Sequence, residues 1–377
     1  MIYFLYQQLV EFLDPESGIS SFVNVFRYVT FRAGAACVTG FLLSVIFGGR
    51  VIRALISLKV GQPIRSAEEV HQLNELHGGK AGTPTMGGIL FLGATVASVI
   101  LWTRLNEPFV WVILGVTVSL GGLGAYDDFL KVSRKNAVGL SARGKLLAQV
   151  LVAGAAGVYL CYFAGESTGV YMRQLFFPGI KSPIVLDMGW LMPVLFVLVI
   201  VGSSNAVNLT DGLDGLATGC SITTAAALGV YAYVTGHVFF AKEYLFLPYH
   251  PGCPEVFILC MAFIGSALGF LWFNCHPAQV FMGDTGSLAI GGLLATSAIC
   301  CKQELLLPLI AGVFVMEACS VILQVASFKT TGKRIFKMSP IHHHFELGGW
   351  KETQVISRFW ILSLIFALAG LVFLKVR

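Results

Sequence analysis

The 377-residue chain contains ten long apolar runs, and this pattern is typical of one kind of architecture. A helix needs about 17 to 25 mostly apolar residues to cross the roughly 30 Å hydrocarbon core of a membrane. Hydrophobic residues make up 56% of the chain and charged residues 12%, about half the charged share of a soluble domain. We therefore predict an all-α, polytopic integral membrane protein with about ten transmembrane helices. The runs are 30–49, 86–103, 109–125, 146–164, 185–204, 213–235, 256–273, 286–301, 305–328 and 355–374.

One transmembrane catalytic domain is expected over residues 1–377, with segment 1–20 at the membrane interface. Residues 1–13 lack a basic start and contain Glu11, so they predict an interfacial helix and not a secretory signal. The run 286–301 is the weakest candidate span, because it is short and rich in Gly and Ala.

Lys and Arg are distributed unevenly between the loops. The odd-numbered loops hold 16 of them, counting Arg358 at the edge of the last span, and the even-numbered loops hold 5. Because cytoplasmic loops are enriched in Lys and Arg, we expect the odd loops to face the cytoplasm and both termini to lie outside. The net charge of +5 mostly reflects this bias, so it suits an anionic substrate at the membrane surface and does not predict a nucleic-acid partner. The odd loops are 50–85, 126–145, 205–212, 274–285 and 329–354.

The nine cysteines do not predict disulfides. Seven lie in or beside apolar runs, and none forms a Cys-x-x-Cys pair, so they are expected to be small core residues. These seven are Cys37, Cys161, Cys220, Cys260, Cys300, Cys301 and Cys319.

Asp127 and Asp128 follow directly after an apolar run. Two carboxylates about 4 Å apart repel by about 1 kcal/mol in water and about 4 kcal/mol at an effective dielectric near 20. A bound cation would remove this repulsion, and oxygen ligands of this kind suit magnesium. The alternative is an exposed loop pair balanced by Lys131, Arg134 and Lys135.

The segment 202–217 joins two apolar runs and carries Asn208, Asp211 and Asp214 without any basic residue. At this three-residue spacing the side chains would line one surface of a helix. Alternatively, Thr210 or Asp211 caps the next helix. A cap would explain the presence of one acidic residue in this segment but not of the other.

The next odd loop places Asp284 between two glycines at the expected start of a helix. Glycine lets a ligand approach the backbone closely, and the amides at a helix N-terminus attract phosphate. Phe281 is expected to be exposed and able to stack on a planar base. The alternative is an Asp N-cap in a tight turn.

Glu317 and Gln324 lie seven residues apart within the run 305–328, so they share one face of a helix. Because a Glu in mid-membrane costs roughly 2.5 to 3.5 kcal/mol on insertion scales, this face is expected to point into the protein. The pattern leaves open whether Glu317 has a structural or a functional role.

His342, His343 and His344 are adjacent, a spacing that does not favour zinc. Imidazoles can instead donate to a pyrophosphate or orient a carboxylate. Lys80 and Thr85 in a Gly/Thr-rich turn, together with Lys145, form a plausible phosphate cradle, although ordinary helix-entry loops are equally consistent with them.

Four segments carry a resemblance to a known family: 82–88 (GTPTMGG), 205–216 (NAVNLTDGLDGL), 277–284 (PAQVFMGD) and 340–346 (PIHHHFE). With them in this order the chain closely resembles the bacterial phospho-N-acetylmuramoyl-pentapeptide transferases, members of the polyprenyl-phosphate N-acetylhexosamine-1-phosphate transferase superfamily. The resemblance implies a homodimeric, Mg²⁺-dependent enzyme of the bacterial cytoplasmic membrane. Its reaction joins UDP-N-acetylmuramoyl-pentapeptide to undecaprenyl phosphate and gives lipid I and UMP, the first membrane step of peptidoglycan synthesis.

The resemblance also implies roles for individual residues. Asp127, Asp128 and Asp284 match the catalytic aspartates, and Asp284 matches the magnesium position. Departures are Tyr126, Thr285 and the Cys275-His276 pair. The remaining matches are cleft residues Asn208, Asp211, Asp214, Asn274, His342, His343 and His344, and nucleoside-side residues Lys80, Thr85, Phe281 and Gln324.

Two mechanisms and three other functions remain open at this stage. The lipid phosphate, deprotonated or oriented by Asp127 with Lys145 stabilising charge, attacks the sugar-side phosphorus directly, or the reaction passes through a phosphorylated Asp127. The other functions are a UDP-N-acetylglucosamine-1-phosphate transferase, a cation-coupled transporter and a non-catalytic scaffold.

Overall fold

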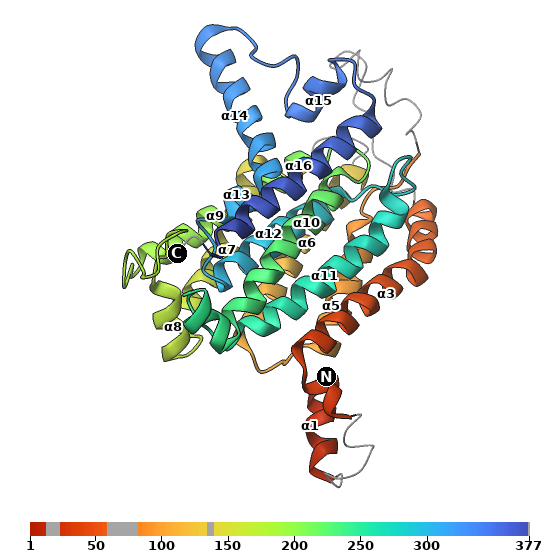
Figure 1. The fold of residues 1–377 in the computed structure, drawn as a ribbon. Helices are drawn as coiled ribbons and strands as arrows, with labels where there is room; N and C mark the ends of the chain where they lie inside the picture. Colours follow the sequence, from red (N-terminus) through yellow and green to blue (C-terminus); the bar gives the residue numbers. More distant parts are fainter. Residues whose placement is uncertain (13–22, 59–81, 134–138, 376–377) are drawn as a thin grey trace.

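The computed structural model describes residues 1–12, 23–58, 82–133 and 139–375, and its regular elements are helices. Figure 1 shows most of them side by side in one bundle, with α1 projecting at one end and α14 and α15 at the other. The helices are α1 (Ile2–Phe12), α3 (Val29–Ser57), α5 (Gly88–Trp102), α6 (Pro108–Ser133), α7 (Ala142–Tyr162), α8 (Glu166–Arg173), α9 (Leu191–Thr210), α10 (Leu216–Thr235), α11 (Cys253–Asn274), α12 (Gly283–Cys300), α13 (Leu307–Ile310), α14 (Gly312–Thr331), α15 (Ile341–Glu346) and α16 (Glu352–Val372), with a 3-10 turn at Asn24–Arg27 and a π-helix at Phe239–Tyr244.

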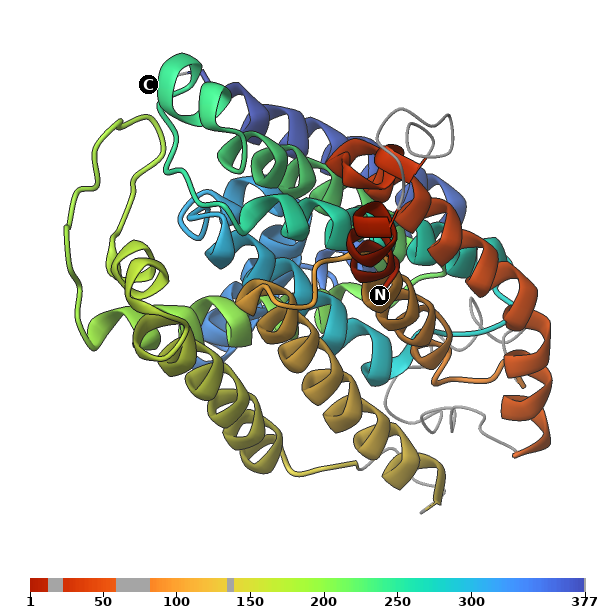
Figure 2. The same cartoon turned by 90° about the horizontal axis from the view of Figure 1, so that it is seen from below.

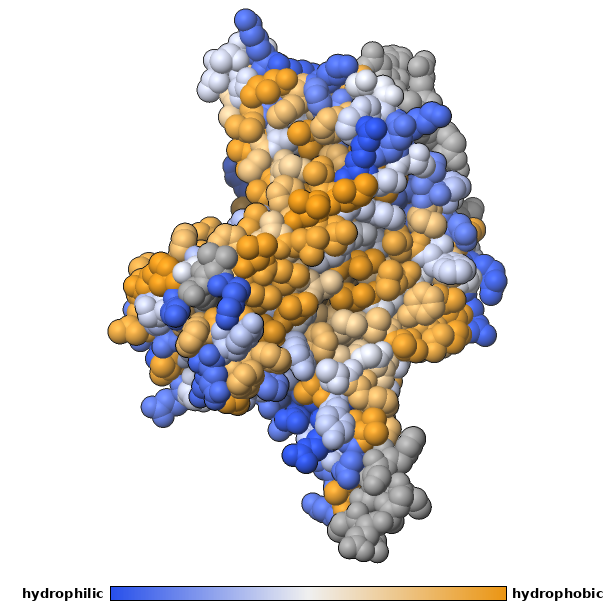
Figure 3. Space-filling model, in the orientation of Figure 1, coloured by the Kyte–Doolittle hydropathy of each residue, from blue (hydrophilic) through white to orange (hydrophobic). Residues whose placement is uncertain are grey.

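Nine of the ten predicted apolar runs each overlap one helix, whereas run 305–328 is divided between α13 and α14. Within the described residues, eight helices are long and apolar enough to cross a membrane, and α5 is a shorter apolar helix. The eight are α3, α6, α7, α9, α10, α11, α14 and α16. On the face drawn in Figure 3, hydrophobic residues form a broad band across the helices while hydrophilic residues gather toward the ends. The all-α, polytopic membrane fold is therefore confirmed.

Helix α12 corresponds to the weakest of the predicted spans and lies at the centre of the protein. All of its residues except Asp284 are buried, and it packs against α5, α6, α9 and α10. A helix surrounded by other helices needs small side chains more than apolar ones, because small residues let backbones approach closely. A Cβ at Gly291, for example, would meet the backbone of Ser203 and Ser204 in α9. The low hydropathy of this run thus reflects burial in protein.

A buried ion pair joins three segments at the end of the bundle that carries α1. Arg32 of α3 donates from Nη1 and Nη2 to the two carboxylate oxygens of Glu255 in α11, at 2.9 and 2.8 Å. The same carboxylate accepts the backbone N–H of Arg104 at 2.8 Å, and Arg32 also donates to the carbonyl of Trp102. Bidentate arginine–carboxylate pairs of this kind combine strength with fixed geometry.

The polar segments of the odd loops meet at the opposite end of the bundle. The backbone N–H of Gly87 donates to the carbonyl of Phe281 at 2.8 Å, and Asn208 and Lys145 both bind Asp284. Figure 2 views the bundle from the end that carries α1 and shows the segment between α8 and α9 extending at the edge opposite α3. The prediction that these segments share one face is confirmed for the residues that the structure describes.

All nine cysteines are free thiols, as the spacing predicted. Five of the seven expected core cysteines are buried and Cys37 is half-buried, but Cys319 is exposed on α14, so its assignment to the core was wrong. A thiol beside an apolar run can face lipid as readily as protein, which the run alone does not distinguish.

Gly124 offers a test of the contact between α6 and α12. A Cβ at Gly124 would clash with the backbone carbonyl of Asp284, whereas Gly122 on the same helix is exposed with open space around it. We expect Gly124→Ala to lower the unfolding free energy by about 1 to 3 kcal/mol, the usual effect of overpacking, and to lower the melting temperature in detergent. Gly122→Ala is the matched control, and equal melting temperatures for the two variants would contradict the packing described here.

Candidate functional site

Three aspartates come together where α6 meets α12. Asp127 and Asp128 lie in the last turns of α6, only 3% and 4% exposed, and Asp284 is the second residue of α12. Helix α6 continues to Ser133, well past the apolar run that ends at residue 125. The alternative of an exposed loop pair is therefore wrong, because the helix carries both carboxylates into the protein.

Two lysines neutralise part of this charge. Lys131 Nζ lies 2.8 Å from Asp127 Oδ2 and 2.8 Å from Asp284 Oδ2, and Lys145 Nζ lies 2.7 Å from the same oxygen of Asp284. Lys145, one of the predicted site residues, comes from the first turn of α7 and contacts Asp284. Lys131 was missed as a site residue and considered only as a solvated counter-charge. Its position three and four residues after the Asp pair places it on their face of α6, a helical spacing that could have identified it.

Asp128 accepts hydrogen bonds from the start of α12. Its carboxylate accepts the backbone N–H of Thr285 at 3.0 Å, the hydroxyl of Thr285 at 2.8 Å and the backbone N–H of Asp284 at 3.3 Å. Carboxylates are favourable at the positive end of a helix. Thr285, noted in the sequence as a departure, therefore provides a second donor that ties α6 to α12.

A cavity of about 120 Å³ opens beside the three aspartates. Asn208 of α9 closes one side, donating to Asp284 Oδ1 at 2.7 Å and to Ser287 Oγ at 2.9 Å. The hydroxyl of Thr85 is buried without a hydrogen-bond partner among the described residues. A water occupies roughly 30 Å³, so the space suits an ion with its ligands or a phosphate group. The lining residues are Thr85, Asp128, Lys131, Val132, Asn208, Asp211, Gly283 and Asp284.

The helical spacing proposed for Asn208, Asp211 and Asp214 was wrong. Helix α9 ends at Thr210, and α10 begins only after Gly215, whose φ of +76° is a left-handed conformation that favours glycine. Asn208 and Asp211 line the cavity, whereas Asp214 points to a different group of side chains. Neither proposed cap exists either, because α10 has no side-chain cap.

Asp211 lies in the turn between α9 and α10. Burial, reinforced by the charges of Asp284, Asp128 and Asp214, raises the pKa of its carboxyl to about 8, although a hydrogen bond from the backbone of Gly283 acts in the opposite direction. The carboxyl of Asp211 is therefore largely protonated near neutral pH unless a cation enters the site.

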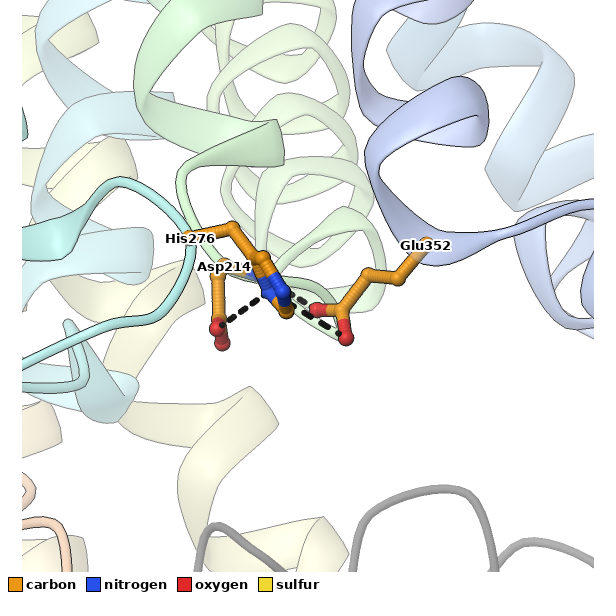
Figure 4. Close-up of side chains that lie close together, drawn as sticks. All are labelled: Asp214, His276 and Glu352. Carbon is orange, nitrogen blue, oxygen red and sulfur yellow. Dashed lines mark hydrogen bonds and ion pairs between the residues drawn. The ribbon is translucent and has the colours of Figure 1, made fainter.

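Asp214 forms a second group with His276 and Glu352 (Figure 4). His276 Nδ1 lies 3.1 Å from Asp214 Oδ2 and 3.5 Å from Glu352 Oε2. The backbone N–H of Ala278 also donates to Asp214 Oδ2 at 3.1 Å. His276 and Glu352 were not among the predicted site residues, although His276 had been noted as unusual.

Two predicted residues shape the loop before α12. The amide of Asn274 is buried, donates to the carbonyl of Val280 at 2.9 Å and accepts the hydroxyl of Thr218 at 2.9 Å. Phe281 is half-buried, and its backbone N–H donates to the carbonyl of Pro84 at 2.8 Å. The expected exposure of the Phe281 ring is thus only partial, because the loop pairs with the segment before α5.

Glu317 and Gln324 are both buried on α14, as the cost of a mid-membrane acid predicted. Gln324 accepts the backbone N–H groups of Ile335 and Phe336 and donates to the carbonyl of Phe336. Its amide therefore holds the loop after α14, a structural role that the predicted nucleoside contact did not anticipate.

The three histidines point in different directions. His342 is fully buried, with Nδ1 3.1 Å from Glu317 Oε1 and Nε2 against Gly212 in the turn that carries Asp211. His343 Nδ1 lies 2.8 Å from Glu346 Oε2, and His344 Nδ1 accepts the backbone N–H of Lys337 at 3.1 Å. Of these three histidines, only His342 contacts the turn beside the cavity in these interactions. Lys80, the remaining predicted residue, lies outside the described residues.

Comparison with known proteins now identifies the family. A family model described as Glycosyl transferase family 4 matches residues 110–302, and a signature of the phospho-N-acetylmuramoyl-pentapeptide-transferases matches residues 80–92. The phospho-N-acetylmuramoyl-pentapeptide-transferase of Methylacidiphilum infernorum (isolate V4) is 50% identical over 369 residues, which cover 98% of this chain and all of that protein.

The chain belongs to the phospho-N-acetylmuramoyl-pentapeptide-transferase family. The matched regions coincide with the site: the family signature contains Thr85, and the broader family match contains the three aspartates and both lysines. The regions shared with the family therefore include residues that line the cavity.

Asp211 gives a pH test of the site. Its folded pKa of about 8 lies above the ordinary value of 3.8, so the penalty for ionising it grows as pH rises from about 4 to about 8 and is complete above that. In chelator-treated protein, Asp211→Asn should melt at least about 2 °C higher than wild type at pH 8.5 and at the same temperature at pH 4. Glu243→Gln, which removes an exposed acid between α10 and α11, is the control. An equal shift at both pH values would contradict the assignment.

Proposed function

We propose that the protein transfers phospho-N-acetylmuramoyl-pentapeptide from UDP-N-acetylmuramoyl-pentapeptide to undecaprenyl phosphate, giving lipid I and UMP. The observation that carries the proposal is the cluster of Asp127, Asp128 and Asp284 with Lys131 and Lys145 beside a phosphate-sized cavity. Phosphoryl transfer depends mainly on positioning and on stabilising charge. This chain belongs to a family whose named relative carries that activity.

The donor set of the cavity suits Mg²⁺. Four carboxylates, those of Asp127, Asp128, Asp211 and Asp284, are opposed by only two ammonium groups, so two negative charges remain when all four ionise. The nearby ligands are oxygens of carboxylates and of the Thr85 hydroxyl, the kind that magnesium prefers. Asp284 would hold the ion, with Asp128 and Asp211 facing the same space. Bound there, Mg²⁺ would neutralise charge on the diphosphate of the nucleotide sugar.

The residues around the cavity have different roles in the transfer. Lys131 and Lys145 present ammonium groups to the charge that develops during transfer, and Asp127 orients the phosphate of the lipid acceptor. An oxygen of this phosphate attacks the sugar-side phosphorus, and the bond to the UMP oxygen breaks. Asp127 already accepts the backbone N–H of Leu140 and binds Lys131. These contacts support direct attack by the lipid phosphate over a phosphorylated Asp127, whose formation would disrupt them.

An apolar groove offers a place for the lipid chain. Its volume is about 310 Å³, and it runs between α9, α12 and the α13–α14 segment. A polyprenyl chain is wholly apolar and already lies in lipid, so van der Waals packing against the groove, and not loss of contact with water, would hold it there. Lining residues include Leu198, Val207, Leu294, Leu307, Phe314 and Ala318.

Sidedness and assembly complete the proposal. We place the protein in the bacterial cytoplasmic membrane with the odd loops and the site in the cytoplasm and both termini outside, as the Lys and Arg bias indicates. The homodimer implied by the family resemblance remains part of the proposal. A cation-coupled transporter is less well supported, because Asp127, Asp128, Asp211 and Asp284 gather at one end of the bundle.

The test is release of UMP by detergent-purified protein supplied with undecaprenyl phosphate and either UDP-N-acetylmuramoyl-pentapeptide or UDP-N-acetylglucosamine. We expect lipid-dependent release from the pentapeptide substrate alone, abolished without Mg²⁺ and reduced at least about 100-fold in Asp284→Ala, since such electrostatic groups contribute about 10² to 10³ in rate. Glu243→Gln, an exposed acid remote from the site, is the control. Release from UDP-N-acetylglucosamine instead would identify the protein as a UDP-N-acetylglucosamine-1-phosphate transferase. No release of UMP from either nucleotide sugar would contradict the proposed transferase function.

A further inference from the structure

We propose that Asp214, His276 and Glu352 form a second divalent-cation site, for zinc-class ions, distinct from the magnesium site at Asp284. The three side chains come from different segments: the turn between α9 and α10, the loop between α11 and α12, and the first residue of α16. In Figure 4 the imidazole of His276 lies between the two carboxylates. The transferase reaction proposed above assigns no role to His276 or Glu352.

The distances fit a tetrahedral ion. Each residue offers one ligand atom, and these atoms all lie within 4.8 Å of one another. The separations from His276 Nδ1 to the nearer oxygens of Asp214 and Glu352 are 3.1 and 3.5 Å. Zinc bonds of about 2.0 to 2.2 Å in tetrahedral geometry place neighbouring ligands roughly 3.3 to 3.6 Å apart. The group therefore needs only small side-chain movements to enclose an ion.

The ligand types select the ion. One imidazole nitrogen with two carboxylates is a mixed set that suits Zn²⁺ and Co²⁺, whereas Mg²⁺ prefers oxygen ligands and near-octahedral geometry. Three protein ligands also leave a fourth position for water. The Asp214 and Glu352 side chains are 2% and 12% exposed and that of His276 is 35% exposed. An ion can therefore enter from the His276 side while the carboxylates stay fixed.

The surroundings orient both carboxylates. Asp214 Oδ2 accepts the backbone N–H of Ala278 at 3.1 Å, and Glu352 Oε1 accepts the backbone N–H of Asp214 at 3.2 Å. Such outer contacts fix the direction of ligand atoms and raise metal affinity. A bound ion would fasten the Asp211 turn, the loop that leads to Asp284 and the start of α16 to one another.

The experiment is a titration of chelator-treated, detergent-purified protein with Co²⁺ in millimolar Mg²⁺, followed by displacement with Zn²⁺. We expect one Co²⁺ per chain with the visible absorption of a tetrahedral ion. His276→Gln and Glu352→Gln should each weaken binding at least tenfold. The controls are Cys275→Ser, which removes the exposed neighbouring thiol, and Asp284→Asn, which alters the magnesium site; both should bind Co²⁺ like wild type. Melting curves without metal establish that each variant is folded.

Absence of saturable Co²⁺ binding to the wild type would overturn the proposal and leave His276 as a side chain that only contacts the two carboxylates. Unchanged affinity in folded His276→Gln would also overturn it, and loss of binding in Cys275→Ser would assign the ion to the thiol. Because the readout is metal binding, these results are independent of whether the protein releases UMP.

Discussion

The compensation of buried carboxylates by Lys131 and Lys145 is the interaction on which the site depends. Asp127, Asp128 and Asp284 come from two helices that must pack tightly for the acids to meet. An unpaired charge in such a place is costly, and removing one partner of a buried pair is commonly more damaging than the pair is stabilising. The lysines thus allow α6 and α12 to bring the acids together. The negative charge that remains uncompensated favours a cation in the cavity, and that cation together with the lysines would bind phosphate.

Helix α12 transmits this arrangement to the rest of the fold. Its small residues allow close contact with neighbouring helices, and its N-terminal N–H groups at Asp284 and Thr285 are held by Asp128. The loop before it pairs with the segment before α5, and the turn after α9 is covered by His342. Segments far apart in sequence therefore enclose one cavity, although most of them contribute structural contacts and only a few line the space.

Much of the fold follows from the sequence, because apolar length and loop charge report directly on the requirements of lipid. The positions of the helices were predicted well, and so was the inward face of α14. The end of α6 was not, because hydrogen bonding continues a helix beyond the last apolar residue. The three-residue spacing also misplaced Asp211 and Asp214, since α9 ends at Thr210 and α10 begins only after Gly215. Lys131 could have been found from its helical spacing to the Asp pair. Asn274 and Gln324 acquire their observed contacts through tertiary packing, which a single sequence does not encode locally.

A double-mutant cycle of Lys131→Met and Asp284→Asn, measured by unfolding of the metal-free protein in detergent, tests the central claim most directly. Each single change removes one partner of a pair 2.8 Å apart, and contacting residues in one ionic network typically couple by about 0.5 to 3 kcal/mol. We predict that Lys131→Met is destabilising in the wild-type background and clearly less so when residue 284 is neutral. Strictly additive effects would contradict the account, because the lysine would then have no part in holding Asp284.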